Sequence, residues 1–422
     1  MKNLLLMIFS FGTVTLLSQN IYTPSQGPGY SLQTYFSLRD GATTSIPYAD
    51  WDIAFDVSPG GSGIFVNESV GISFTEELDE VALYYSSVAD FADADTTQMQ
   101  RIYNQEASWQ RGAFNEMANP DNPFDLGWGE YSPVTHTVSG SRVFFLHLRD
   151  GSYKKVMIQS LAGGAYTFRY ANLDGTQDTS QVVHKSDFTG KTLAYFSFAS
   201  GQTIDAEPEK WDLLFTRYAT PLYDEDLQAF IPYMVAGVLQ NTGVEVARAV
   251  QVDPATVDYN DYLNAFQDSL NTIGYDWKRF DFQAGWQIPT DLVYFVKTPD
   301  GSIWKTQFLD FEGSSTGTST MEVSYETILT STEAIHRSVS GLSVYPNPLS
   351  QEQINIAFEL QSEEGWAELS LINTLGQQLL RRPVDITRGL NVLQLPIEVE
   401  AGLYYLNLRI GDELISQLII VE

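Results

Sequence analysis

The chain has 422 residues, of which 43% are hydrophobic and 13% aromatic, so it is apolar enough for packed cores and too apolar for disorder. Its 53 acidic and 23 basic residues give a net charge of −30, which repels nucleic acids and anionic membranes. It has no cysteine, which excludes disulfides, thiolate catalysis and cysteine-ligated zinc, and its 4 histidines supply few metal ligands.

Residues 1–18 have the pattern of a secretory signal peptide. Lys2 gives the positive start, an apolar run extends from Leu4 to Leu17, and Ser18 is a small residue at a plausible cleavage point. The alternative is a buried N-terminal strand or helix. No other stretch reaches the roughly 18 apolar residues of a membrane span, so we expect no transmembrane segment after cleavage.

An internal duplication organises residues 19–328. The phrase Tyr35-Phe36-Ser37, followed by Trp51-Asp52, recurs 160 positions later as Tyr195-Phe196-Ser197, followed by Trp211-Asp212. Each copy has the pattern of a strand, a polar turn and a second short strand that begins near the tryptophan. We therefore predict an all-β protein with two tandem antiparallel β modules, residues 19–187 and 188–328.

The second part of the repeat predicts a β-hairpin in each module. Asp150-Gly151 and Asp300-Gly301 each lie between two runs of β-branched and aromatic residues, and such turns favour Gly because they need positive φ. Further strands are predicted at residues 166–170 and 321–325. Residues 96–115, within a more polar insertion of the first module, and residues 257–270 of the second are the best candidates for helices.

The C-terminal part of the chain has a different pattern. Residues 329–341 are rich in Ser and Thr and predict a linker. In residues 342–422, short alternating runs are separated by glycines, which is typical of a small immunoglobulin-like β-sandwich. We expect strands at residues 354–358, 367–371, 391–395 and 404–408.

Residues 342–422 resemble the C-terminal sorting domain of type IX secretion cargo. The residues that carry this resemblance are Tyr345-Pro346-Asn347-Pro348, Leu375-Gly376-Gln377, Ala401-Gly402-Leu403-Tyr404 and the apolar end Leu418-Ile419-Ile420-Val421. The resemblance implies recognition by the type IX secretion machinery, passage through the outer membrane, removal of the domain, and release or surface attachment. An ordinary immunoglobulin-like accessory domain is the alternative.

The duplicated module resembles the HmuY-like family of secreted haem-binding proteins. Tyr195-Phe196-Ser197-Phe198, Trp211-Asp212, Gly285-Trp286 and Asp300-Gly301 carry the resemblance in the second copy, and Gly127-Trp128 and Asp150-Gly151 repeat part of it in the first. The resemblance implies haem or another porphyrin as ligand. Family members are typically anchored by a lipidated cysteine, which this chain lacks.

The family resemblance implies a histidine ligand shortly after the Gly-Trp pair, and His136 is the histidine found there. The upstream segment offers Met117 and Met99 as candidate second haem ligands. In the second copy, residues 259–282 contain no His or Met, so we expect any haem site to lie in the first module. The alternative for His136 is an exposed residue at a strand edge, with no metal.

The other conspicuous residues suit structural roles. We expect Trp51 and Trp211 in the core, Asp52 and Asp212 as acceptors of backbone N–H groups, and an acidic partner for Arg217. His147 has the position of a residue on a strand face. His184 and His336 are expected to be exposed.

No pattern in the sequence indicates an enzyme. Gly60-Gly61-Ser62-Gly63 and Ser139-Gly140-Ser141-Arg142 lack the strand–turn–helix setting of a nucleophile elbow, and no phosphate-binding loop is present. We expect a secreted or cell-surface, non-catalytic ligand-binding protein, with haem or another porphyrin as the candidate ligand. The alternative is a structural or adhesive surface protein that binds protein or glycan.

Overall fold

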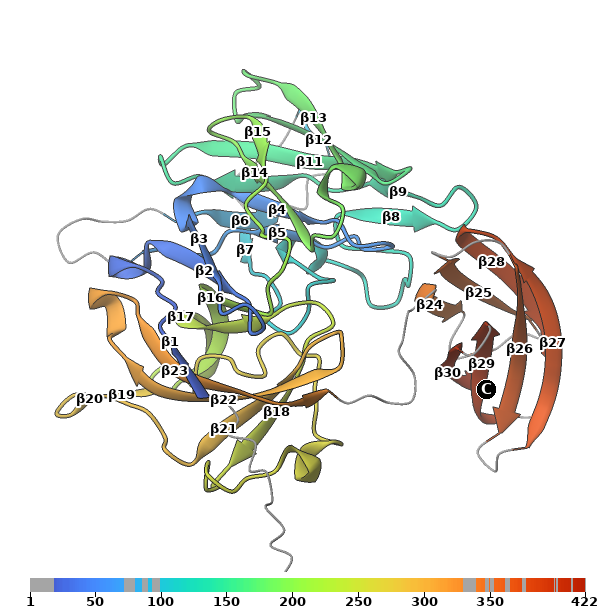
Figure 1. Ribbon diagram of the computed structural model, residues 1–422. Coiled ribbons are helices and arrows are strands. Elements are labelled where there is room, and N and C mark those ends of the chain that lie inside the picture. Colours follow the sequence, from blue (N-terminus) through green and yellow to red (C-terminus); the bar gives the residue numbers. More distant parts are fainter. Residues whose placement is uncertain are drawn as a thin grey trace, which may run out of the picture. The chain divides into compact units, whose positions relative to one another are not determined.

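The computed structural model describes residues 19–71, 80–85, 90–92, 99–328 and most of 339–421, and these parts consist of β-strands, loops and short 3-10 turns (Figure 1). Its gaps after residue 339 are 346–348, 350–352, 361–364, 374–376, 398, 400 and 411–412. The predicted all-β class is confirmed. The predicted signal peptide, His336 and most of the predicted linker lie outside the described residues. No described helix is long and apolar enough to cross a membrane.

The two predicted helices are wrong. The helical segments of the described chain are single 3-10 turns: η1 (Pro28–Tyr30), η2 (Tyr48–Asp50), η3 (Ala113–Asn115), η4 (Lys185–Phe188), η5 (Tyr259–Tyr262) and η6 (Gly313–Ser315). Within residues 257–270, Tyr259, Tyr262 and Phe266 pack onto one face of a sheet as part of a covering loop. Their spacing imitates the apolar face of a helix, which explains the error.

Contacts divide the chain into two compact units, with the division between residues 329 and 330. The first unit stacks four antiparallel sheets, two in each of two lobes (Figure 1). The outer sheet of the first lobe runs in the order β13 (Thr179–His184), β12 (Ala165–Asn172), β11 (Tyr153–Ala162), β10 (Phe144–His147), β6 (Ala82–Tyr85) and β7 (Gln100–Ile102). In addition, β9 (Thr137–Gly140) pairs with β11, and β8 (Gly129–Ser132) pairs with β9. Its inner sheet contains β15 (Gln202–Ile204), β14 (Leu193–Ser197), β4 (Ile53–Asp56) and β5 (Ile64–Val66).

The second lobe repeats this plan. Its inner sheet contains β17 (Ala229–Gln240), β16 (Leu213–Asp224), β2 (Leu32–Phe36) and β3 (Thr43–Pro47). Its outer sheet contains β1 (Gln19–Tyr22), β23 (Ser319–Ile328), β22 (Ser302–Phe311), β21 (Leu292–Lys297) and β18 (Glu245–Val250). A separate hairpin joins β19 (Arg279–Asp281) to β20 (Gly285–Gln287). Both predicted Asp-Gly hairpins are present, with φ of 77° at Gly151 and 83° at Gly301.

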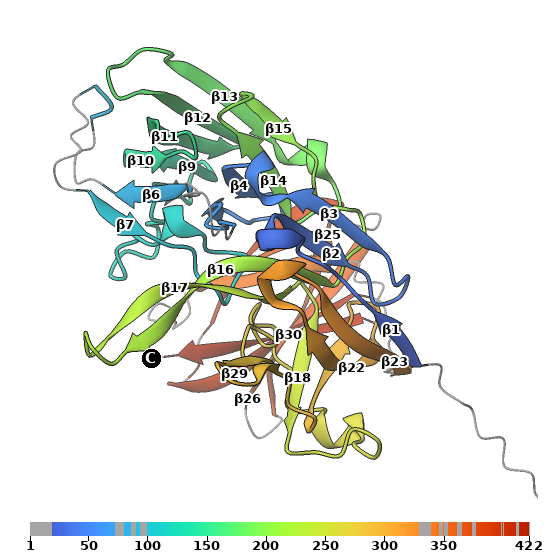
Figure 2. The same ribbon diagram turned by 90° about the vertical axis from the view of Figure 1, so that its left-hand side faces the viewer.

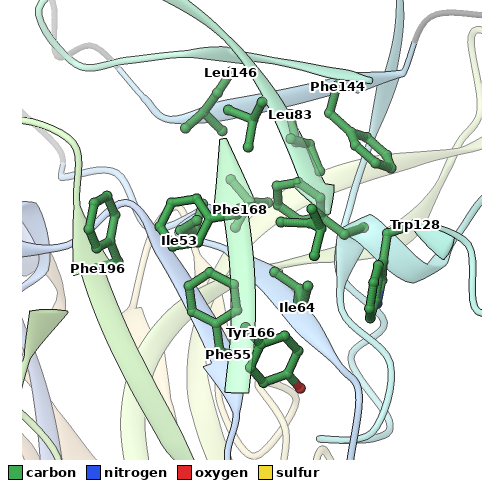
Figure 3. Close-up of a cluster of buried hydrophobic side chains, with 14 of the residues drawn as sticks. Ile53, Phe55, Ile64, Leu83, Trp128, Phe144, Leu146, Tyr166, Phe168 and Phe196 are labelled. Carbon is green, nitrogen blue, oxygen red and sulfur yellow. The ribbon is translucent and has the colours of Figure 1, made fainter. Parts of the chain in front are cut away.

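The two copies of the duplicated phrase exchange strands. β2 belongs to the first copy but pairs with β16 of the second, and β14 belongs to the second copy but pairs with β4 of the first. Figure 3 shows the result in the first-lobe core, where Phe196 from β14 packs 5.0 Å from Phe168 between ring centroids. The sheets therefore cross the expected module boundary between residues 187 and 188.

The exchanged strands are buried on both faces because they lie in the two inner layers. In β4, Ile53 and Phe55 point into the first-lobe core, whereas Ala54 packs in the cluster between the lobes. In β16, Leu213 and Phe215 pack into the second-lobe core, and Leu214 faces the interlobe side. Such strands need apolar residues at consecutive positions, and both copies of the phrase supply them.

Equivalent hydrogen bonds in the two copies stabilise the exchanged strand pairs. Asp52 accepts a hydrogen bond from the backbone N–H of Phe198, and Asp212 accepts one from that of Leu38, both at 2.7 Å. Trp51 and Trp211 are 8% and 5% exposed, so their predicted burial is confirmed. Arg217 donates to the carbonyl oxygens of Val70 and Met234 in place of the expected acidic partner.

The second unit is a β-sandwich of three and four strands. One sheet contains β24 (Val339–Tyr345), β25 (Gln353–Leu360) and β28 (Gly389–Pro396), and the other contains β27 (Gln378–Ile386), β26 (Gly365–Asn373), β29 (Gly402–Ile410) and β30 (Glu413–Val421). Ile356, Leu369 and Leu406 are among the side chains that fill the core between them. All four strands expected from the sequence are present.

Candidate functional site

His136 lies in the turn between β8 and β9 of the first lobe. Its backbone has a φ of 52°, in the left-handed region that histidine enters more readily than most residues, and its N–H donates to the Ser132 carbonyl at 2.9 Å. The side chain is exposed. Its Nδ1 atom lies 3.0 Å from the Tyr131 hydroxyl, so the turn presents an oriented imidazole at the surface.

The imidazole contacts Tyr131, and Tyr131 in turn contacts Phe124. The ring centroids of Tyr131 and His136 are 6.4 Å apart, as are those of Tyr131 and Phe124. Phe124 is 40% exposed and Val134 is 87% exposed. We call these four residues the His136 surface. Exposed apolar side chains beside an imidazole, a common metal ligand, suit a flat, hydrophobic ligand that contains a metal.

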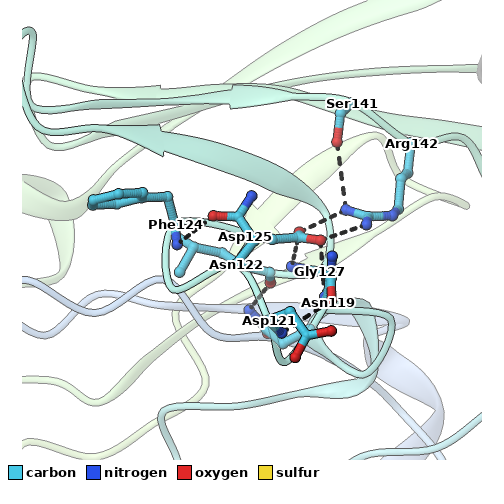
Figure 4. A network of polar contacts seen from close by, with 10 residues as sticks. Asn119, Asp121, Asn122, Phe124, Asp125, Gly127, Ser141 and Arg142 are labelled. Carbon is cyan, nitrogen blue, oxygen red and sulfur yellow. Dashed lines mark hydrogen bonds and ion pairs between the residues drawn. The ribbon is translucent and has the colours of Figure 1, made fainter.

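A polar network fixes the loop that carries Phe124 (Figure 4). The Asp125 carboxylate accepts two hydrogen bonds from the Arg142 guanidinium, at 2.7 and 2.6 Å, and one each from the N–H groups of Asn119 and Gly127 at 2.9 Å. Partial burial alone would raise the pKa of Asp125, but these hydrogen bonds outweigh it and lower the pKa to about 2. The network therefore holds the loop that places Phe124 beside Tyr131.

The two candidate methionine ligands have different surroundings. Met117 follows η3 and is half-buried against the first-lobe core. Met99 is half-buried and directly precedes β7, the edge strand of the outer sheet. Of the three predicted ligands, only His136 is exposed together with aromatic neighbours.

The remaining described histidines have structural surroundings. His147 is half-buried on β10, with its ring centroid 4.6 Å from that of Tyr153. His184 is exposed at the end of β13. Within the described residues, no group of three or more His, Asp or Glu side chains could hold a metal ion.

Two exposed aromatic hairpins in the second lobe were not predicted as surface features. Pairing of β16 with β2 ends at Phe215, so the outer half of the β16–β17 hairpin continues without a third strand (Figure 2). There, Tyr223 and Phe230 are 55% and 71% exposed, with ring centroids 5.3 Å apart. On the β19–β20 hairpin, Phe280 and Phe282 are 54% and 98% exposed.

Two prolines in the sequence indicate that the β16–β17 hairpin is not a pair of buried central strands. Pro221 and Pro232 lie opposite each other in the β16–β17 pair. Proline lacks an N–H donor and is confined to edge strands or irregular positions, so both prolines mark strands with an unpaired side. The residues around the prolines are aromatic and β-branched, as in buried strands, so the sequence did not indicate that these side chains are exposed.

Comparisons with known proteins identify the second unit. Residues 343–422 match the family model of the secretion system C-terminal sorting domain. This unit is a type IX secretion sorting domain. The protein is therefore secreted or attached to the cell surface.

Two solved structures align with most of the chain, at low similarity. No curated protein matches the chain. Apo PinO from Porphyromonas gingivitis aligns with 74% of this chain and 98% of its own, at 10% identity and a TM-score of 0.23. Dimeric latent PorU from Porphyromonas gingivalis aligns with 95% of this chain and 34% of its own, at 8% identity and a TM-score of 0.17. TM-scores this low assign no fold to the first unit.

Proposed function

We propose that the first unit is a non-catalytic ligand-binding domain that works outside the cell, and that the His136 surface binds haem or another porphyrin. The observation that carries this proposal is the exposed imidazole of His136 beside the Tyr131 ring, with the exposed side chains of Phe124 and Val134 in the same surface. Its Nδ1 atom is engaged by Tyr131, and Nε2 has no hydrogen-bond partner among the described residues. The family resemblance of the repeated phrase supports the same ligand.

The residues of this surface fit one axial haem ligand. Haem iron accepts an imidazole nitrogen, and the apolar faces of Phe124 and Tyr131 suit the porphyrin plane. Met117 packs against the core, so a second protein ligand requires that its side chain change place. We therefore expect one haem per chain, with His136 as the principal protein ligand and no site in the second lobe.

A haemin titration followed by the Soret band tests this proposal. Wild type should show saturable one-to-one binding, and His136→Ala should weaken it by at least tenfold. His184→Ala is the matched control, because His184 is an exposed histidine of the same lobe. Met117→Leu and Met99→Leu should leave the spectrum unchanged if the iron has one protein ligand. Tight binding that survives His136→Ala, or two haems per chain, would exclude this site.

Adhesion is the second candidate function, and the exposed aromatic hairpins favour it. Soluble proteins seldom expose apolar side chains in groups unless the surface contacts a partner. A Tyr223→Ser/Phe230→Ser double variant should reduce attachment of the protein to glycan or protein arrays, with haemin binding unchanged. If both hairpins can be made polar without any loss of attachment, adhesion does not use them.

A further inference from the structure

A groove lies on the outer face of the second lobe. It encloses about 420 Å³ between the loop residues 255–260 and the strands β22 and β23. Lys305, Ser324 and Glu326 form its floor on the sheet. On these strands the neighbouring residues Phe308, Met321 and Val323 point into the second-lobe core, so the floor residues face away from that core.

The first lobe has a matching position in its outer sheet. Lys155 follows Asp150-Gly151 at the same distance as Lys305 follows Asp300-Gly301. Lys155 pairs with Ala171 across β11 and β12, as Lys305 pairs with Ser324 across β22 and β23. Sequence and strand register therefore place the two lysines at equivalent points.

In the first lobe, this position holds an aromatic ring of the chain itself. The ring of Phe91 lies 4.9 Å from the Lys155 ammonium and 4.3 Å from the Arg169 guanidinium, measured to the ring centroid. Phe91 is 7% exposed and packs with Val143 and Ala171. A lysine under an aromatic face is a favourable cation–π arrangement, and its strength grows as water is excluded.

In the second lobe, the loop residues leave the groove open. Tyr259 lines the groove but packs towards Phe295, with ring centroids 6.5 Å apart. The Lys305 ammonium donates to the Pro254 carbonyl at 2.8 Å, which holds it in position at the groove. Ser324 donates to the Glu326 carboxylate at 2.8 Å, so an acceptor lies on the groove floor.

We propose that this groove binds the phenolic side chain of tyrosine in a peptide ligand, with the ring over Lys305 in the manner of Phe91 over Lys155. The cation selects an aromatic ring, and the carboxylates of Glu326 and Asp258 at the groove accept the phenolic O–H. This site lies in the second lobe and the His136 surface in the first, so tyrosine binding can be tested independently of haem binding.

Saturation-transfer NMR on the full chain tests the proposal, with N-acetyl-L-tyrosinamide as the probe and N-acetyl-L-leucinamide as the apolar comparison. Wild type should transfer saturation to the tyrosine ring protons and bind the leucine probe at least fivefold more weakly. Lys305→Met removes the cation, and Ala255→Trp fills the groove from an exposed loop position. Each should weaken tyrosinamide binding at least fivefold, whereas Lys305→Arg should retain it.

Lys297→Met is the matched control, because Lys297 lies in the neighbouring strand β21, outside the groove, and pairs with Glu245. It should leave probe binding unchanged. The proposal is overturned if wild type gives no saturation transfer, if both groove variants bind like wild type, or if the leucine probe binds equally well. Ala255 is exposed, so Ala255→Trp is expected to fold. If Lys305→Met does not fold, probe binding by Ala255→Trp still tests whether the groove is the binding site.

Discussion

The hydroxyl groups of Tyr35 and Tyr195 lie 2.6 Å apart, although the two residues are 160 positions apart in the chain. They occupy the same place in the two copies of the duplicated phrase, and both are almost fully buried. Each ring also packs against the tryptophan of the opposite copy, Tyr35 on Trp211 and Tyr195 on Trp51, at 5.1 and 4.9 Å between centroids. This hydrogen bond therefore joins equivalent residues of the two copies of the phrase.

Removing either hydroxyl should destabilise the first unit by about 1–2 kcal/mol, because the remaining hydroxyl loses a buried partner. The double variant Tyr35→Phe/Tyr195→Phe should cost less than the sum of the two single changes. Urea denaturation measures the three free energies of unfolding, and Tyr223→Phe, at an exposed ring, is the control. Strictly additive effects would mean that the two hydroxyls are not coupled.

Trp211→Ala should destabilise the first unit by about 3–5 kcal/mol, because it leaves a cavity between the lobes. It also removes the hydrogen bond from the indole N–H to the buried Glu207 carboxylate, 2.8 Å long. Thermal melting provides the measurement. Trp366→Ala, at a site 65% exposed in the sorting domain, should have little effect. A Trp211 variant that melts like wild type contradicts the core role.

Stability should fall as pH rises from about 4.5 to about 7, because burial raises the pKa of Glu68 from 4.5 to about 7. Between these values the folded state holds a proton that the unfolded state releases, so the stabilisation is complete below the lower pH and is lost towards the higher. Burial also raises the pKa of Asp52 and Asp212, which adds to this trend.

Glu68→Gln should reduce the change in the free energy of unfolding across this pH window. The reduction should be at most on the order of 3 kcal/mol. Chemical denaturation at pH 5 and pH 7.5 measures the difference. Glu209→Gln, at an exposed position, should retain the wild-type slope. A slope that is unchanged in Glu68→Gln would show that Glu68 titrates normally.

Asp125→Ala should cost about 1.5–3 kcal/mol, because it removes charge-assisted hydrogen bonds at a nearly buried carboxylate. Hydrogen exchange should increase at the N–H groups of Asn119 and Gly127. Asp178→Ala breaks a similar pair with Arg169 that is exposed to solvent, and should destabilise the protein less than Asp125→Ala does. Equal costs for the two variants would mean that burial of the Asp125 pair adds nothing.

We predict that the mature protein lacks residues 1–18 and most of the chain beyond about residue 342. A signal peptide and a sorting domain are expected to be removed during export. Intact-mass spectrometry of the protein from its native host measures both ends directly. An exported protein that retains its C-terminal sandwich contradicts the second cleavage.

Local patterns predicted much of the fold. The glycines of the two Asp-Gly turns, the apolar runs beside them and the alternating strands of the sorting domain depend on interactions between near neighbours, so the sequence reveals them. The partners of β2 and β14 were not predictable, because either copy of the phrase satisfies the pairing pattern equally well. Tyr259, Tyr262 and Phe266 were misread because a loop that covers a sheet can have helical spacing.

The candidate site was predicted less completely than the fold. His136 could be selected because few histidines are available, but its contacts with Tyr131 and Phe124 depend on how the β8–β9 turn meets a separate loop. The groove at Lys305 depends on a difference between two equivalent positions, one covered by Phe91 and the other open. Sequence alone shows the two lysines as a repeat and gives no sign of that difference.

Strand exchange between the copies has the form of a domain-swapped dimer joined into one polypeptide. Leu213 of the second copy pairs with Phe36 of the first, and Leu193 of the second pairs with Asp56 of the first. A polypeptide with a single copy would therefore lack the strand that completes its inner sheet. We expect such a half-protein to take that strand from a second molecule and so to dimerise. An ancestor with one copy would then have been a dimer, and gene duplication would have converted its subunit association into folding of a single chain.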